Sequence, residues 1–220
     1  MKCFVIIPAA GIGKRFGSSL PKQFYKMEGR EILIHTLQKF ERIRNVSCVN
    51  IATKKKYFRR IRNLLLKNNY SKPFKIIAGG TERQDSVFNA LKNCDCSNND
   101  IVLVHDAVRP FVSRKLIKEL ILSAVKFKAV IPVLNISDTI KQVKEKDIVS
   151  TLPRENLKRA QTPQAFEYKL LYDAFVHAYK NNFKATDESS ILENYGFPVK
   201  FIEGEESNIK ITKKSDLKNK

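Results

Sequence analysis

The sequence predicts an α/β protein: a Rossmann-like, mostly parallel twisted sheet flanked by helices, with a protruding β-arm. Three observations predict this class. Residues 3–8 form an almost continuous apolar run, which is typical of a parallel strand buried on both faces. Strand-like and helix-like segments then alternate as far as residue 133. After residue 134 this alternation gives way to polar stretches with strand periodicity.

The other elements are expected in the following order. Helical periodicity predicts helices at residues 32–43, 54–68, 83–92 and 113–126, the last of them capped by Ser113. Apolar runs predict the strands between them, at residues 47–53, 74–78, 101–105 and 129–133. After the arm we expect helices at 167–181 and 187–194 and strands at 199–202 and 208–212. The whole chain, residues 1–220, is expected to form a single domain.

The segment between residues 134 and 162 is predicted to be the arm. It has strand-type alternation on both sides of a turn near residues 145–147, but no core face of its own. A hairpin of this kind needs another surface to pack on, and that surface often belongs to a second subunit. We therefore expect a homodimer held through this arm.

The composition excludes several classes of protein. The 41 Lys and Arg residues outnumber the 22 Asp and Glu residues, which gives a net charge of +19. These cations are spread along the chain without aromatic interleaving on a strand face. They therefore predict a solvated basic surface that attracts anionic substrates, with no nucleic acid as partner. No apolar run is long enough for a membrane span, and the first strand leaves no room for a signal peptide. We expect no membrane partner and a cytoplasmic location.

A glycine-rich turn follows the first strand. Gly11 and Gly13 allow backbone N–H groups to approach a polyphosphate closely, and Lys14, Arg15 and Lys22 can neutralise its charge. The spacing excludes a dinucleotide fingerprint, because the next glycine arrives one residue late, and it supplies no Walker loop. A tight turn with incidental cations would explain the loop alone. The Pro-Lys-Gln continuation around Lys22 favours a nucleoside triphosphate site, because it places a second cation at a fixed distance from the glycine-rich turn.

Two later segments fall at the expected carboxyl ends of strands, where open α/β sheets bind ligands. Gly80 and Thr81 follow one strand, and Ser86 lies in the first turn of the next helix, which favours polar ligand groups. A capped helix start is the alternative for these residues. Asp106 and Arg109 follow another strand. We expect Asp106 to bind Mg²⁺ and Arg109 to clamp a phosphate, with a simple Asp–Arg surface pair as the alternative.

Taken together, these segments resemble one family. The shared motifs run in order over nearly the whole chain, at residues 8–15, 21–23, 79–87, 104–110, 138–139, 162–164, 186–188 and 208–212. A single glycine-rich loop is a weak signal, but this ordered series is specific. The chain resembles the 2-C-methyl-D-erythritol 4-phosphate cytidylyltransferases, which are enzymes of non-mevalonate isoprenoid biosynthesis.

The resemblance implies a role for each candidate residue. The cytidine would be surrounded by Pro8, Ala9, Ala10, Gly11, Gly80, Thr81 and Ser86. The catalytic cations would be Arg15, Lys22 and Lys210. Arg15 and Lys22 would contact the triphosphate of CTP and stabilise the α-phosphorus during attack, and Lys210 would add a further cation. Thr139, Arg154 and Thr162 would hold the methylerythritol phosphate beside Arg109, and the arm would carry Thr139 and Arg154 into the partner's site.

The implied reaction is an in-line attack of the substrate phosphate on the α-phosphorus of CTP, with magnesium pyrophosphate as the leaving group. The nucleophile is already anionic, so no general base is needed, and catalysis rests on positioning and charge stabilisation. His105 is accordingly expected to be structural.

Other functions stay open at this point. A ribitol-5-phosphate cytidylyltransferase resembles this family throughout and differs in the polyol pocket. A sugar-1-phosphate nucleotidylyltransferase shares the glycine-rich loop, although such chains are generally longer. A nucleic-acid-binding protein is allowed by the basic charge and would be favoured by aromatic and basic residues interleaved on one strand face. Two departures from the family pattern are Val108, where a smaller residue is usual, and the end of the chain soon after Leu217, where relatives continue with a helix.

Overall fold

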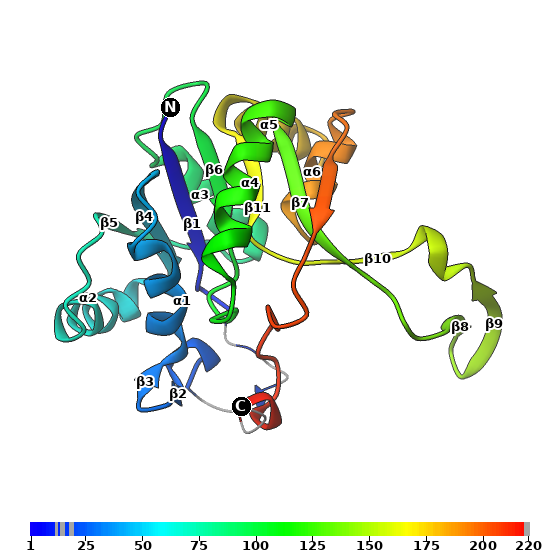
Figure 1. Ribbon diagram of the computed structural model, residues 1–220, viewed down its shortest axis with the longest axis horizontal. Coiled ribbons are helices and arrows are strands. Elements are labelled where there is room, and N and C mark those ends of the chain that lie inside the picture. The colour runs from blue at the N-terminus through cyan, green and yellow to red at the C-terminus, as the bar shows by residue number, and fades with distance from the viewer. Residues whose placement is uncertain (12, 14–15, 18–19, 218–220) are drawn as a thin grey trace.

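One sheet is the framework of the computed structural model, which describes residues 1–11, 13, 16–17 and 20–217. The strand order is β10-β7-β11-β6-β1-β4-β5, and β12 pairs with β7 (Figure 1). These strands are β1 Cys3–Pro8, β4 Val46–Thr53, β5 Phe74–Ala78, β6 Ile101–Val104, β7 Ala129–Asn135, β10 Lys158–Ala160, β11 Gln164–Glu167 and β12 Lys200–Glu203. The pairs β1–β4, β1–β6, β4–β5 and β7–β12 are parallel. The predicted α/β class with a mostly parallel sheet is confirmed.

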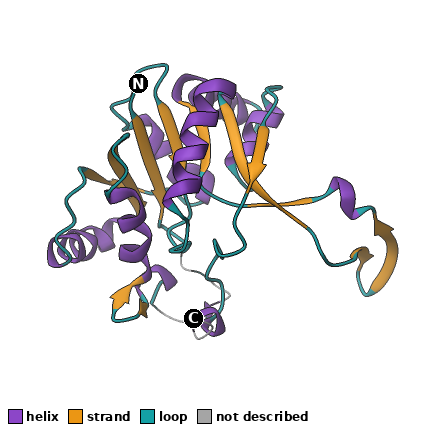
Figure 2. Cartoon of the chain, viewed as in Figure 1, coloured by secondary structure: helices purple, strands orange, loops and turns teal. Residues whose placement is uncertain are grey.

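Helices cover both faces of the sheet (Figure 2). They are α1 Ile32–Glu41, α2 Phe58–Lys67, α3 Arg83–Lys92, α4 Arg114–Phe127, α5 Tyr168–Lys180 and α6 Glu188–Asn194. On one face, α1, α2 and α4 share a core with Val5 and Ile7 of β1. On the other face, α3, α5 and α6 share a core with Ile6. Successive side chains of β1 therefore enter opposite cores, which explains why its sequence is apolar throughout.

The antiparallel part of the sheet was not predicted. β11 lies between β6 and β7 and is antiparallel to both. Its four residues are too few for a periodic signal, so its position depends on the space between its neighbours. Phe166 at its centre is fully buried, and burial of such a side chain contributes about 1.5–3 kcal/mol.

The strand predicted at residues 208–212 is wrong, because this segment has no regular secondary structure. Its backbone groups pair with partners at the edge of the sheet instead of with a neighbouring strand. Ile211 donates its N–H to the Val108 carbonyl at 2.9 Å and accepts a hydrogen bond from Lys22 Nζ at 3.0 Å. The segment consequently crosses the carboxyl-terminal edge of the sheet, near the expected site.

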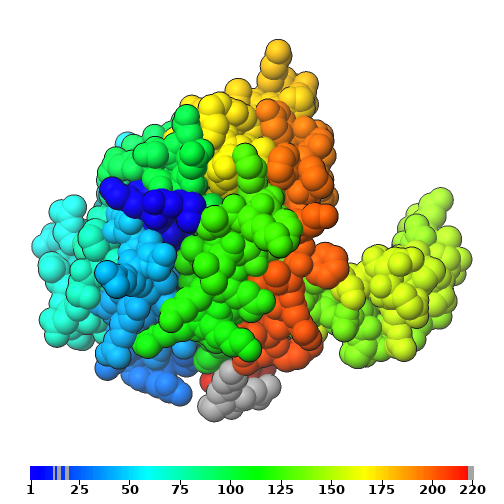
Figure 3. All heavy atoms as spheres, turned by 45° about the horizontal axis from the view of Figure 1, so that its top comes forward, coloured from blue at the N-terminus to red at the C-terminus, as the bar shows by residue number. Residues whose placement is uncertain are grey.

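The middle of the predicted arm, between Asn135 and Lys158, projects far from the body of the molecule, whereas the two ends of the predicted segment pair as β7 and β10 within the main sheet (Figures 1 and 3). It contains the antiparallel hairpin of β8 Ile140–Lys144 and β9 Asp147–Leu152. Val143, Ile148 and Val149 are exposed on it. A smaller hairpin, β2 Lys26–Met27 and β3 Arg30–Glu31, precedes α1. Within the described part of the chain, no helix is both long and apolar enough to cross a bilayer.

Candidate active site

The first site segment leaves β1 at Pro8 and is pinned by hydrogen bonds. Ala9 donates its N–H to the Ala52 carbonyl at 2.7 Å. The buried Gln23 side chain donates from Nε2 to the Ala9 carbonyl at 2.7 Å and to the Gly11 carbonyl at 3.4 Å. Gln23 thus braces the start of the glycine-rich turn, a role that its place in a short motif did not indicate.

Two of the predicted triphosphate contacts, Lys14 and Arg15, fall outside the residues that the structure describes. Their expected roles stay predictions. The remaining candidates of the turn are placed, and they lie at the end of β1, where the sequence predicted them.

The second segment connects β5 to α3, and its glycines are required by close packing. A Cβ atom on Gly79 would lie 2.7 Å from Ala10 Cβ, and one on Gly80 would lie 2.1 Å from Asp85 Cβ. Gly80 donates its N–H to Ser86 Oγ at 3.1 Å, and that hydroxyl donates to the Glu82 carbonyl at 3.0 Å. The two site segments therefore touch each other, and the Ser86 hydroxyl holds the turn together.

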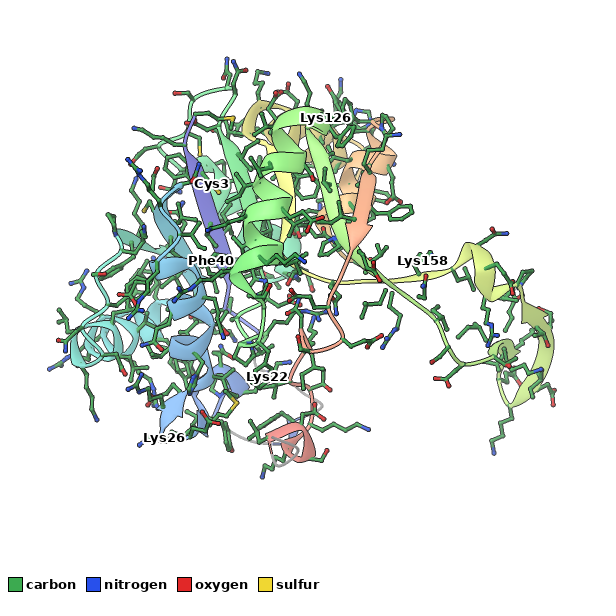
Figure 4. The ribbon with its side chains drawn as sticks, in the orientation of Figure 1. Cys3, Lys22, Lys26, Phe40, Lys126 and Lys158 are labelled. Atoms are coloured by element: carbon green, nitrogen blue, oxygen red, sulfur yellow. The ribbon has the colours of Figure 1, made fainter. Side chains whose placement is uncertain are left out.

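Lys22 and Lys210 approach the same region from distant parts of the chain. Lys22 begins a short 3₁₀ turn, Lys22–Phe24, and its Nζ donates to the Ile211 carbonyl at 3.0 Å. Figure 4 labels Lys22 at this edge of the sheet. The same segment places Lys210 Nζ 2.9 Å from Oδ2 of Asp106.

Asp106 lies just beyond β6 and is surrounded by three cations. Its Oδ2 is 2.9 Å from Lys210 Nζ and 3.3 Å from Arg109 Nε, and its Oδ1 is 3.7 Å from Arg83 Nε. Burial by itself would raise the pKa of Asp106, but the charges of Lys210, Arg83 and Arg109 outweigh it and hold this pKa well below its usual range. The carboxylate stays ionised and gathers the three cations around one point.

Arg83 is a site residue that sequence reasoning missed as a candidate. It begins α3 and forms a bidentate pair with the buried carboxylate of Glu188, with nitrogen–oxygen distances of 2.6 and 2.9 Å. Burial opposes its charge, but the attraction of Glu188 and Asp106 raises the pKa of Arg83 above its ordinary value. The sequence signals were its place shortly after two glycines and inside the shared motif at residues 79–87, and neither revealed its partner, because Glu188 lies more than 100 residues away.

Two adjoining hollows contain most of the predicted residues. The larger, of about 310 Å³, is lined by these candidates: Pro8, Ala9, Ala10, Gly11, Lys22, Thr81, Ser86, Asp106 and Lys210. The smaller, of about 120 Å³, is lined by Arg109 and Thr162. Arg83, Asp106 and Lys210 line both, so the cation cluster lies at their boundary. Gly80 lines neither hollow and acts through packing.

Thr139 and Arg154 are not brought to this site within their own chain. Both are exposed on the arm, and Arg154 donates from Nη1 to the Ser137 carbonyl. Figure 3 shows the arm standing clear of the body. A contact between these residues and substrate requires the site of another subunit and stays a prediction.

The surroundings of Asp106 do not form a protein-built magnesium site. Among the described residues, no group of three His, Cys, Asp or Glu side chains is arranged to hold a metal ion. Both oxygens of Asp106 already face cations, and an added divalent ion would meet their like charge. This geometry disfavours Asp106 as a primary Mg²⁺ ligand, and the contact expected from its position at a strand end stays a prediction.

Comparison with known proteins identifies the family. The family model described as 2-C-methyl-D-erythritol 4-phosphate cytidylyltransferase matches residues 3–219. The chain belongs to this family. A relative with that name from Clostridioides difficile is 45% identical over 216 residues, covering 97% of this chain and 90% of the relative. Another from Acidobacterium capsulatum is 40% identical over 226 residues, covering 99% of this chain and 95% of the relative.

A solved structure supports the same assignment. The 2-C-methyl-D-erythritol 4-phosphate cytidylyltransferase of Francisella tularensis superposes with a TM-score of 0.86 at 38% identity, covering 99% of this chain and 97% of that one. The predicted enzyme class, a nucleotidyltransferase, is therefore confirmed.

Proposed function

We propose that this protein transfers the cytidylyl group of CTP to 2-C-methyl-D-erythritol 4-phosphate, forming 4-diphosphocytidyl-2-C-methyl-D-erythritol and pyrophosphate. Family membership over residues 3–219 supports the proposal. The structural observation that carries it is the cluster of Lys210, Arg83 and Arg109 around Asp106, where two hollows meet. Such a cluster suits a reaction that joins two anions.

In this scheme the larger hollow takes the nucleotide and the smaller one takes the polyol phosphate. Arg109 binds the attacking phosphate, whose oxygen forms a bond to the α-phosphorus while the bond to pyrophosphate breaks. The attacking oxygen carries no proton, so no base is required. Lys22 and Lys210, with Arg15, stabilise the negative charge that grows on the α-phosphate and the leaving group.

We propose Mg²⁺ as part of the nucleotide substrate. Its ligands would be phosphate oxygens of CTP, because Mg²⁺ is commonly bound through substrate phosphates, the described residues form no cluster of three metal-binding side chains, and Asp106 is already paired with cations. We also infer that the enzyme works as a homodimer through the arm. A cytoplasmic location fits the four unpaired cysteines, since disulfides are rare in reducing compartments.

The decisive experiment measures pyrophosphate release by the purified protein. CTP with Mg²⁺ and methylerythritol phosphate should give turnover, whereas CTP alone should not, and mass spectrometry should find the diphosphocytidyl product. Ribitol 5-phosphate serves as the matched acceptor, and ATP, GTP and UTP serve as matched nucleotides. A clear preference for ribitol 5-phosphate would overturn the proposed acceptor. Undiminished turnover in EDTA would remove the magnesium requirement.

A further inference from the structure

His105 is a fully buried histidine that the proposed reaction leaves unused. Its Nε2 lies 3.0 Å from the carbonyl oxygen of Arg109, and its Nδ1 lies 3.0 Å from Oγ1 of Thr162. Burial lowers the pKa of His105 to about 4, so the ring is neutral at pH 7. Both ring nitrogens therefore have protein partners, and neither reaches the hollows.

The partners determine the direction of each hydrogen bond. A carbonyl oxygen can only accept, so Nε2 carries the single ring proton and donates it to Arg109. Nδ1 must then accept the hydroxyl hydrogen of Thr162. With its own hydrogen used, Oγ1 of Thr162 accepts the backbone N–H of Asp106 at 3.1 Å. A directional chain thus runs from Asp106 through Thr162 and His105 to the Arg109 backbone.

Asn208 connects this chain to the other site cations. The buried side-chain Nδ2 of Asn208 donates to the Thr162 carbonyl at 2.8 Å. The backbone carbonyl of Asn208 accepts from Nη1 of Arg109 at 2.7 Å. Lys210 follows two residues later and reaches Asp106. The Asp106 backbone, the Arg109 guanidinium and the Lys210 segment are consequently joined to one buried network with His105 at its centre.

We propose that His105 is a positioning residue, whose Nε2–H form sets, through Thr162 and the Arg109 backbone, the geometry in which Asp106 and Arg109 meet the attacking polyol phosphate. It rests on the proposed function, which places that phosphate at Arg109. It also gives the Thr162 hydroxyl a positioning role, while Thr162 lines the smaller hollow and its expected contact with the substrate stays a prediction. His105 itself touches no substrate.

A matched pair of substitutions separates the two bonds of the ring. His105→Asn keeps an acceptor where Nδ1 lies but loses the donor to Arg109, and His105→Gln keeps a donor where Nε2 lies but loses the acceptor for Thr162. Each should lower kcat/KM for the polyol phosphate roughly ten- to a hundredfold, the usual effect of one unmade buried hydrogen bond. The KM for CTP should stay within about twofold, because the nucleotide is proposed to occupy the larger hollow, which neither His105 nor Thr162 lines.

Thr162 supplies the rescue test. Thr162→Val breaks the chain and should match the histidine variants, whereas Thr162→Ser keeps the hydroxyl and should recover most of the kcat/KM that Thr162→Val loses. Because both residues belong to one chain of bonds, His105→Asn combined with Thr162→Val should cost little more than either alone. His177→Asn is the control and should leave the kinetics unchanged, because His177 lies on α5 and its ring contacts Asn181, just after the end of that helix.

The outcomes separate this inference from the function on which it rests. Additive effects, equal loss for both substrates, or no rescue by Thr162→Ser would reduce the network to general structural support and overturn the inference. If the His105 variants have normal kinetics and Arg109→Ala is impaired, the inference about His105 is overturned and the proposed function stands. Normal polyol-phosphate kinetics in Arg109→Ala would instead reject the proposed phosphate site. If the His105 variants do not fold, the Thr162→Val and Thr162→Ser pair decides.

Discussion

At Asp106 a single carboxylate holds Lys210, Arg109 and Arg83 at 2.9, 3.3 and 3.7 Å. Cations this close would repel one another without the carboxylate between them. Arg83 is itself fixed by Glu188, so the cluster is braced from α6 as well. Incoming phosphates therefore meet positive groups that are already in place and need little reorganisation, which is the condition for strong electrostatic catalysis.

Lys22→Ala should lower kcat more than it raises the KM for CTP. The lysine side chain lines the nucleotide hollow, and its charge matters most when negative charge builds up in the transition state. The loss of one such preorganised contact typically costs about 10²–10³ in rate. Steady-state kinetics with both substrates varied provide the measurement, and circular dichroism checks the fold. A nearly normal kcat with a raised KM would assign Lys22 to ground-state binding.

The buried His105 should make the protein less stable in mild acid. Its folded pKa of about 4 lies below the ordinary value of 6.5, so as pH falls the unfolded chain takes up the proton first. Stability from this group is complete above about pH 6.5 and is lost as pH falls towards 4. Between pH 7 and pH 5 we expect the free energy of unfolding to fall by about 2 kcal/mol from this group. Urea denaturation of wild type and His105→Asn at both pH values measures it, and an equal fall in the two proteins would contradict the assignment.

Among the elements, the arm differs most from the rest of the molecule. β8 and β9 pair with each other and not with the main sheet, and Val143, Ile148 and Val149 are 62%, 66% and 59% exposed. Exposed apolar side chains on an isolated hairpin are typical of a surface that another subunit covers. Arg154 begins the short 3₁₀ turn that follows this hairpin.

Mixing two inactive variants tests whether the active sites are shared. Arg154→Ala should chiefly weaken binding of the polyol phosphate, whereas Lys22→Ala impairs the nucleotide site of its own chain. If the arm serves the partner's site, a mixed dimer contains one site with both lesions and one with neither. Part of the activity should return after the subunits exchange. Subunit exchange demonstrated by native mass spectrometry without recovered activity would mean that each site is built within one chain.

At the scale of the whole molecule, the net charge of +19 surrounds a site for two anionic substrates. Basic side chains gather away from the site as well, for example Lys56 just before α2 and Arg59, Arg60 and Lys67 along it. A positive electrostatic field raises the rate at which phosphates encounter the protein. The surface side chains that create this field do not contact the phosphates in the transition state. The charge therefore acts on substrate capture rather than on the chemical step.

This division predicts a salt dependence. Increasing concentrations of potassium chloride should lower kcat/KM for both substrates while changing kcat much less, because mobile ions screen long-range attraction more than contacts in a partly buried site. Replacing Arg59 and Arg60 by Gln should reduce the slope of kcat/KM against salt without changing kcat. An equal salt effect on kcat and kcat/KM would show that the salt acts inside the site.

Local patterns in the chain were sufficient to predict the α/β class and the positions of the helices and parallel strands. They were also sufficient to predict the arm and to recognise the family. These properties depend on apolar periodicity, on glycines and on short motifs, all of which are readable over a few residues. The site segments at the ends of β1, β5 and β6 were predicted for the same reason, because parallel strands bring their carboxyl ends to one edge.

Long-range packing decided the rest. The insertion of β11 between β6 and β7 and the irregular course of residues 208–212 depend on neighbours distant in the chain. The roles of Arg83 and His105 arise from partners 105 and 57 residues away, Glu188 and Thr162. The cations around Asp106 likewise disfavour the magnesium contact that its position at a strand end suggested. No local pattern encodes such distances, because they are set only when the sheet and its two helical layers close around the site.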